Sequence, residues 1–424
     1  MRYQERTLAV GAAILATALV LTGCGRASEE GTSSESAPAT AIDDGPATGT
    51  VTMWTMGSEA DALKPFIAEF EKLNPDVTVN VTAVPWAAGH SKLQTAIAGG
   101  ATPDVAMIGS SWMSEFAPAL ATVPDNFSAD DYFPGTIEGT TVDDRWAAVP
   151  WYADVPMLYY RTDLAEKAGW DHPPQSWDDV QELAAAYQSK AGAQWGMRLY
   201  TGPSSFLGNL WIPFTGGATL EDGEKWTFTT PEWQHAMEFY KSWFDKGLVD
   251  PNSDPAPAQM PADFVSGATP MFVATPAGQG AITQIAGADF DSQYALAPLP
   301  YDSTQVSVVG GSHLGVFEKA KNPTAAWKLV HWLSEPEIQA RFFEATGDLP
   351  PGPAAWKLPA LTDNTRIAAV GEALKTALAI PTPPTLEQVF AIGDSTLEQI
   401  RKGTVSIPDA LESLQQQADQ IGLG

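Results

Sequence analysis

A carboxylate interrupts a strongly apolar stretch of this chain, where residues 149–156 read VPWYADVP. Burying an isolated charge is costly, so Asp154 must either pair with another residue or be held for a ligand. Tyr152 lies two positions away and shares the same face of a strand, because side chains alternate along a strand. The pattern predicts that Asp154 and Tyr152 contact a polar ligand.

Polar and aromatic side chains also follow two predicted strands directly. Ser58 and Glu59 come after the first strand, and Ser111 and Trp112 come after the third. Ligands of open α/β sheets bind beyond the carboxyl ends of the strands, so these four side chains are predicted to line one rim. For Ser58 the alternative is a helix N-cap, and for Ser111 and Trp112 it is loop packing.

A pair of glycines precedes the next candidates, Ser312 and His313. Gly310 and Gly311 lack a Cβ and would let the backbone approach a ligand closely. The pattern predicts that Ser312 and His313 belong to the binding site. A histidine with a purely structural role is the alternative.

The spacing of apolar residues predicts the elements that would position this rim. Strands are predicted over residues 50–55, 77–84 and 103–108, separated by helices that end near residues 73 and 98. This order is a βαβαβ unit, which indicates a parallel sheet and an α/β fold.

Downstream, the chain continues with a long apolar run at residues 147–160 and a glycine-interrupted strand at 306–317. The first of these is predicted as one strand that crosses between domains. Amphipathic helices are predicted over residues 177–187, 231–246, 323–333, 386–401 and 408–421.

Composition excludes several classes of function. The formal net charge is −28, which repels nucleic-acid phosphates and anionic lipid. A metal centre needs clustered His or Cys ligands, and the chain has five scattered histidines and one cysteine. Neither a Walker-type phosphate loop nor a Ser-His-Asp grouping is visible. No cofactor and no metal is expected.

The single cysteine ends an N-terminal leader. Arg2 and Arg6 precede an almost wholly apolar run that is too short to span a bilayer as a helix. This pattern predicts a signal peptide over residues 1–23. Residues 21–24 read LTGC and resemble the lipobox of bacterial lipoproteins, which implies acylation of Cys24. Residues 24–49 are rich in small and polar residues, so we predict a flexible tether to the outer face of the cell membrane.

Four stretches of the mature chain resemble the family of bacterial extracellular solute-binding proteins specific for carbohydrates. The first runs from residue 54 to residue 75 and ends in FEKLNP. The others are residues 98–105 (AGGATPDV), 159–164 (YYRTDL) with 174–179 (PQSWDD), and 310–315 (GGSHLG) with 322–327 (NPTAAW). The likeness extends from Thr50 to about Ile421.

The resemblance implies a monomeric, two-lobed α/β protein of the periplasmic-binding-protein type II, with a mainly parallel sheet flanked by helices in each lobe. Residues 50–153 with 313–365 would form the N-terminal lobe, and residues 154–312 with 366–424 the C-terminal lobe. Strands near Asp154 and Ser312 would cross between them as a hinge. The implied ligand is a di- or oligosaccharide held between the lobes, and the implied partner is the permease of an ABC transporter.

The resemblance also assigns roles to individual residues. Glu59, Ser58 and Asp154 match positions that hydrogen-bond sugar hydroxyls, and Trp211 and Phe390 match positions of aromatic rings that stack on sugars. A core position is the alternative for Trp211. The chain departs from the family at Ala277, where a tryptophan commonly stands, so specificity for maltodextrins is not implied.

Two other functions remain open on the sequence. One is binding of a non-sugar solute such as a peptide, a polyamine or a glycerophosphodiester. A phosphate-bearing ligand would favour Arg or Lys on the loops at residues 56–59 and 109–112, which contain neither. The other is a secreted glycoside hydrolase, which needs two carboxylates across the scissile bond. The binding interpretation predicts no enzymatic activity.

Overall fold

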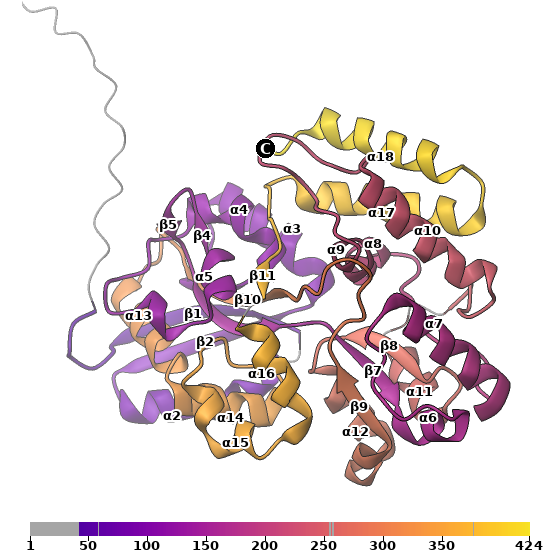
Figure 1. Ribbon diagram of the computed structural model, residues 1–424. Coiled ribbons are helices and arrows are strands. Elements are labelled where there is room, and N and C mark those ends of the chain that lie inside the picture. Colours follow the sequence, from indigo (N-terminus) through magenta and orange to yellow (C-terminus); the bar gives the residue numbers. More distant parts are fainter. Residues whose placement is uncertain (1–41, 58, 254–255, 257, 376) are drawn as a thin grey trace, which may run out of the picture. The chain divides into compact units, whose positions relative to one another are not determined.

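The computed structural model describes residues 42–424, with the exception of residues 58, 254, 255, 257 and 376 (Figure 1). The described residues belong to one compact unit that spans residues 39–424. The predicted signal peptide, Cys24, most of the predicted tether and Ser58 lie outside the described residues. Within the described part, no helix combines the length and the apolar character needed to cross a bilayer.

The first sheet forms from the predicted βαβαβ unit and from strands much later in the chain. Its order is β11-β10-β3-β1-β2, with β6 beside β10. β1 is parallel to both β2 and β3, as predicted, whereas β10 runs antiparallel to β3 and β6. The strands are β1 (Gly49–Met56), β2 (Val77–Val84), β3 (Val105–Gly109), β6 (Val149–Asp154), β10 (Val308–Val316) and β11 (Leu378–Ala379).

The second sheet corrects one part of the fold prediction. β7 (Met157–Arg161) lies between β8 (Met271–Ala274) and β9 (Tyr294–Ala297), and both pairings are antiparallel. The fold class is α/β, as predicted, and a small sheet of β4 (Thr141–Val142) and β5 (Arg145–Trp146) accompanies the two larger sheets. The expectation of a mainly parallel sheet in each lobe is wrong for the second sheet.

The long strand predicted at residues 147–160 is two strands in the structure. β6 ends at Asp154 in the first sheet and β7 begins at Met157 in the second. Pro156 lies between them and lacks the N–H group that a continuous ladder would use. The apolar run therefore connects the two sheets, with a break at Val155 and Pro156, and its crossing between domains stays a prediction. A second crossing leads from β9 to β10.

Most helices start and end close to their predicted limits. Ser176 caps α7 as predicted, because its Oγ accepts from the Asp179 N–H while the Asp179 carboxylate accepts from the Ser176 N–H. The helices longer than six residues are α2 (Lys64–Leu73), α3 (Trp86–Gly99), α6 (Thr162–Ala168), α7 (Trp177–Ala186), α10 (Pro231–Asp245), α11 (Gln259–Ser266), α12 (Gly278–Ala286), α13 (Pro323–Leu333), α14 (Pro336–Thr346), α16 (Ala368–Leu374), α17 (Leu386–Lys402) and α18 (Ile407–Ile421).

Three clusters of buried apolar side chains stabilise this arrangement. One surrounds the first sheet and includes α13 and α14, and a second packs α7, α10, α17 and α18 around part of the second sheet. The third joins both sheets, since it contains Ala153 and Val309 of the first and Tyr159 and Phe272 of the second. This third cluster lies where the chain crosses between the sheets, next to the residues considered below.

Candidate functional site

Three strands of the first sheet end beside one another, and each is followed by a side chain suited to ligand binding. Glu59 begins α1 (Glu59–Ala62) after β1, Trp86 begins α3 after β2, and Trp112 ends a short 3-10 helix, Ser110–Trp112, after β3. β1 pairs with both of the other strands, so these ends lie at one edge of the sheet. Glu59, Trp112 and the additional Trp86 therefore form a rim at this edge, whereas the predicted rim residue Ser58 lies outside the described residues.

Trp86 presents the most accessible ring of this rim. Its side chain is 37% exposed, whereas Trp112 is 7% exposed. The two ring centroids lie 5.4 Å apart at an interplanar angle of 59°. A Cβ built on Gly57 would lie 2.6 Å from Glu59 Oε2 and 2.8 Å from Trp86 Cδ1. The Glu59 carboxylate and the Trp86 indole therefore flank the same glycine.

The first crossing strand brings a hydroxyl to this edge. Tyr152 Oη donates a hydrogen bond to Glu59 Oε1 at 3.3 Å, and both side chains are buried. Burial, followed by the charges of Asp154, Asp348 and Glu59, raises the pKa of Tyr152 above its usual value. Tyr152 therefore stays a neutral phenol, which can both donate and accept hydrogen bonds.

Asp154 ends the same strand and lies among other acids. Its side chain is half-buried. Burial, followed by the charge of Glu59, raises the pKa of Asp154 to about 7, although a hydrogen bond with Thr275 acts in the opposite direction. Thr275 follows β8 directly, so a residue next to the second sheet also takes part.

Asp348 supplies a third carboxyl group to this cluster. The backbone N–H of Ala153 donates to the Leu349 carbonyl at 2.8 Å, which fixes the segment after α14 against β6. Asp348 is 8% exposed, and its Oδ2 finds no hydrogen-bond partner among the described residues. Burial, followed by the charges of Asp154 and Glu59, raises the pKa of Asp348 well above its usual value. An unpartnered buried oxygen of this kind is available to a ligand hydroxyl.

These pKa shifts predict how stability depends on pH. In the unfolded chain Asp154 titrates near its usual pKa of 3.8, and in the folded protein it titrates near 7. The folded state therefore holds a proton that the unfolded state has lost, so this stabilisation is complete below the unfolded pKa and disappears as pH rises through the folded one.

We expect the free energy of unfolding to fall between about pH 4 and about pH 7, by at most about 1.4 kcal/mol per pH unit for this group. Chemical denaturation of the wild type and of Asp154→Asn at a series of pH values measures this change in the free energy of unfolding. The difference in stability between the two proteins should change across this range, and a difference that is constant with pH would contradict the assignment.

The structure gives Ser312 and His313 partners inside the protein. Both are buried within β10, and Ser312 Oγ donates to the Ile108 carbonyl at 3.2 Å. His313 Nε2 lies 2.9 Å from Ser110 Oγ, and burial lowers the pKa of His313 to about 3, so the ring is neutral. These contacts join β10 to the end of β3, which is a structural role. A role in ligand binding stays a prediction for both residues.

Gly311 shows why the crossing strand contains glycine. Its φ is +124°, and a Cβ there would lie 2.2 Å from the Tyr152 carbonyl oxygen. The close approach predicted for this glycine pair is therefore made to the backbone of β6.

The two aromatic residues assigned by resemblance lie in the core around α10 and α17. Trp211 is 3% exposed, and its Nε1 has no hydrogen-bond partner among the described residues. Phe390 is buried in α17, with its ring centroid 5.8 Å from that of Phe206. Ser111 is half-buried on the rim, beside Trp112. The structure does not bring Trp211 or Phe390 into the contacts that join Glu59, Tyr152 and Asp154, and their role as stacking rings stays a prediction.

Sequence reasoning missed Trp86 and Asp348. Trp86 follows the second predicted strand directly, so the rule that selected Glu59 and Trp112 would also have selected it. Asp348 lies in the segment GDLPPG, after α14, and no local pattern there predicts its contact with β6. In the described part of the chain, no group of three His, Cys, Asp or Glu side chains is arranged to hold a metal ion. This includes the group of Glu59, Asp154 and Asp348.

Comparison with known proteins shows the family and the fold of the chain. The profile of a family described as bacterial extracellular solute-binding protein matches residues 57–340. Among solved structures, the sugar-binding protein MalE from the phytopathogen Xanthomonas citri is similar to this chain, with a TM-score of 0.79 and 30% identity. The match covers 88% of this chain and 97% of that one. It supports the two-lobed α/β fold class.

Curated relatives differ in the ligands that their names state. The maltotriose-binding protein of Pyrococcus abyssi is 25% identical over 375 residues, which is 84% of this chain and 78% of the relative. The sn-glycerol-3-phosphate-binding periplasmic protein UgpB of Escherichia coli is 25% identical over 325 residues, which is 69% of this chain and 71% of the relative.

Proposed function

Because this chain belongs to the family of bacterial extracellular solute-binding proteins, we propose that it captures a di- or oligosaccharide outside the cytoplasm. It holds the sugar between its two lobes and delivers it unchanged to the permease of an ABC transporter. The observation that carries this proposal is the grouping of an accessible indole, Trp86, with the acids Glu59, Asp154 and Asp348 beside the crossing strand.

This grouping suits the chemistry of a sugar. A pyranose ring presents hydroxyl groups in fixed directions and C–H faces that pack on aromatic rings. Carboxyl oxygens accept hydrogen bonds from hydroxyls, and the Tyr152 hydroxyl can donate or accept. Trp86 provides the flat apolar surface beside Glu59, and Asp154 and Asp348 provide further acceptors in the same group of acids as Glu59.

Electrostatics favour a sugar over a phosphate ester. The largest charge interactions of Asp154, Asp348 and Tyr152 come from other carboxylates. A phosphate group would add a further negative charge to this cluster and would be repelled. The ligand of this chain is therefore expected to resemble those of the sugar-binding relatives more than that of the glycerol-phosphate-binding relative.

The group of acids is also compatible with a second function, that of a glycoside hydrolase. A carboxylic acid whose pKa is raised, beside a second carboxylate, is also the arrangement of a glycosidase general acid and its partner. Membership of a binding-protein family favours capture without chemistry. Incubation with chromogenic glycosides distinguishes the two functions, since sustained turnover that is lost in Asp154→Asn would establish a hydrolase.

The location and domain limits belong to the same proposal. Cleavage of residues 1–23 and acylation of Cys24 would anchor the protein to the outer face of the cell membrane, and residues 24–49 would act as its tether. The N-terminal lobe would comprise residues 50–153 with 313–365, and the C-terminal lobe residues 154–312 with 366–424. A lipidated fraction in membranes that becomes soluble in Cys24→Ala would support the anchor.

Ligand binding should stabilise the protein measurably. A sugar present at a hundredfold excess over its Kd raises the free energy of unfolding by about 2.7 kcal/mol if it binds only the folded state. A thermal-shift screen of neutral mono-, di- and oligosaccharides, with amino acids, a peptide, a polyamine and glycerol 3-phosphate as controls, measures this effect. A response to one of the controls with no response to any sugar would overturn the proposal.

A further inference from the structure

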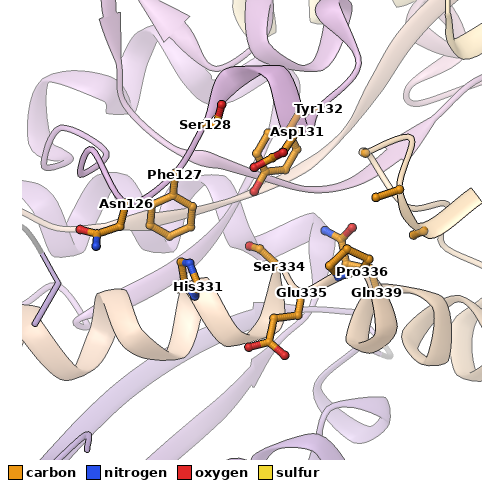
Figure 2. Close-up of a pocket in the computed structure, with 13 residues that line it drawn as sticks. Asn126, Phe127, Ser128, Asp131, Tyr132, His331, Ser334, Glu335, Pro336 and Gln339 are labelled. Carbon is orange, nitrogen blue, oxygen red and sulfur yellow. The ribbon is translucent and has the colours of Figure 1, made fainter. Parts of the chain in front are cut away.

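A second pocket lies on the first sheet's side of the molecule and shares no residue with the site above. Its walls are the loop at residues 126–132, the end of α13 with the start of α14, and the segment at residues 352–355. Figure 2 shows the lining side chains, those of the loop on one side and those of the helices on the other. Its volume is 290 Å³. This is at the lower end of the range for small-molecule sites, roughly 300–1,000 Å³, and suits one ring.

The strongest indication of a ligand is an unmet hydrogen-bond donor. Gln339 lines the pocket and is 5% exposed, and its Nε2 has no hydrogen-bond partner among the described residues. Buried polar groups of native proteins are nearly always paired, so an unpaired amide nitrogen at a pocket wall indicates a missing acceptor. A molecule bound in the pocket can supply that acceptor.

Acidic and hydroxyl groups make up most of the remaining polar lining. Asp131 and Glu335 contribute carboxylates, and burial raises the pKa of Glu335. Tyr132 forms a hydrogen bond with Ser334, and burial raises the pKa of Tyr132 to about 12, so its hydroxyl is neutral. The described lining contains no Lys or Arg.

An apolar wall completes the pocket. The Phe127 ring lies 5.2 Å from the His331 ring at an interplanar angle of 67°, and both line the cavity (Figure 2). A ring with C–H faces can pack against such a wall. The pocket therefore combines an apolar plate, two carboxylates and one unmet donor.

We propose that this pocket binds one small uncharged polyol of single-ring size, independently of the ligand between the lobes. Anions are repelled by Asp131 and Glu335. An ammonium ion satisfies the carboxylates but has no lone pair for Gln339 Nε2, since it donates only. A hydroxyl group both donates and accepts, so a polyol meets the carboxylates and the amide together.

The test uses Asp154→Asn, so that binding at the proposed sugar site is weakened, and the pocket variants then show which part of the signal arises from this pocket. Binding of myo-inositol and D-glucose is measured by saturation-transfer NMR, with ethylammonium and inorganic phosphate as the competing chemistries. Gln339→Met removes the donor at similar size. Ala354→Trp blocks the pocket from an exposed lining position and keeps the test valid if Gln339→Met does not fold. Glu337→Gln, exposed in the first turn of α14 and outside the lining, is the matched control for Glu335→Gln.

We expect a saturable signal from at least one polyol. Gln339→Met and Ala354→Trp should weaken it at least tenfold, Glu335→Gln should weaken it less, and Glu337→Gln should leave it unchanged. The inference is overturned if neither polyol binds, if binding survives in both pocket variants, or if only ethylammonium or phosphate binds. Failure of the sugar proposal would instead appear in the thermal-shift screen repeated on Ala354→Trp, in which this pocket is blocked.

Discussion

Replacement of Asp154 by asparagine should weaken sugar binding about a hundredfold while the protein stays folded. Asp154 ends the crossing strand beside Glu59 and Asp348. Above its raised pKa of about 7 it is an ionised carboxylate, which makes stronger hydrogen bonds to sugar hydroxyls than an amide does. A loss of a hundredfold corresponds to about 2.7 kcal/mol, within the range for a hydrogen bond to a charged group. Isothermal titration calorimetry with the sugar found in the thermal-shift screen measures the change in Kd.

The same substitution should not destabilise the free protein, which separates a ligand-binding role from a structural one. Loss of the charge removes its repulsion by Glu59 and Asp348, so the Tm without ligand should stay the same or rise near pH 7. Asp178→Asn, an exposed acid in the first turn of α7, is the matched control and should change neither property. An unchanged Kd in Asp154→Asn would remove Asp154 from the site.

Replacement of Trp86 by alanine should weaken sugar binding tenfold or more, with little change in stability. Trp86 is the accessible ring of the rim, and a stacked ring loses its apolar contact when truncated. A tenfold loss corresponds to about 1.4 kcal/mol. Because the ring is 37% exposed, we expect its removal to change the free energy of unfolding by less than about 1 kcal/mol. Calorimetric titration and chemical denaturation measure the two effects.

Replacements of Trp211 and Trp170 serve as comparisons for Trp86→Ala. Trp211→Ala removes a ring that is 3% exposed in the core and should cost about 3–5 kcal/mol of stability. Trp170, half-buried and stacked on His172 at 4.8 Å, is a control whose replacement should not change affinity. If Trp211→Ala lowered affinity without loss of stability while Trp86→Ala had no effect, the stacking ring would be Trp211 and our assignment of Trp86 would be wrong.

Local patterns in the sequence predicted most of the elements. The strands at residues 50–55 and 77–84, the helix at 323–333 and the Ser176 cap are confirmed because periodicity and capping act over a few neighbouring residues. The antiparallel second sheet was not predicted, because strand direction depends on connections that no local pattern records.

The candidate site was predictable only in part, for a similar reason. Glu59, Tyr152 and Asp154 were selected from strand ends and from a charge in an apolar run, and the structure brings them together. Asp348 was missed because its contact with β6 joins residues far apart in the chain. Trp211 and Phe390 were assigned by resemblance alone, and both rings lie in the core around α10 and α17.

The contact between Trp86 and Trp112 also gives the protein an intrinsic spectroscopic signal at the candidate site. Two indoles with centroids 5.4 Å apart and planes tilted by 59° couple their electronic transitions, and such coupling produces paired bands of opposite sign in circular dichroism. A sugar that slides over the outer indole would alter the tilt or the screening between the chromophores. Occupancy could then be followed in unlabelled protein, which is the property required of a carbohydrate biosensor.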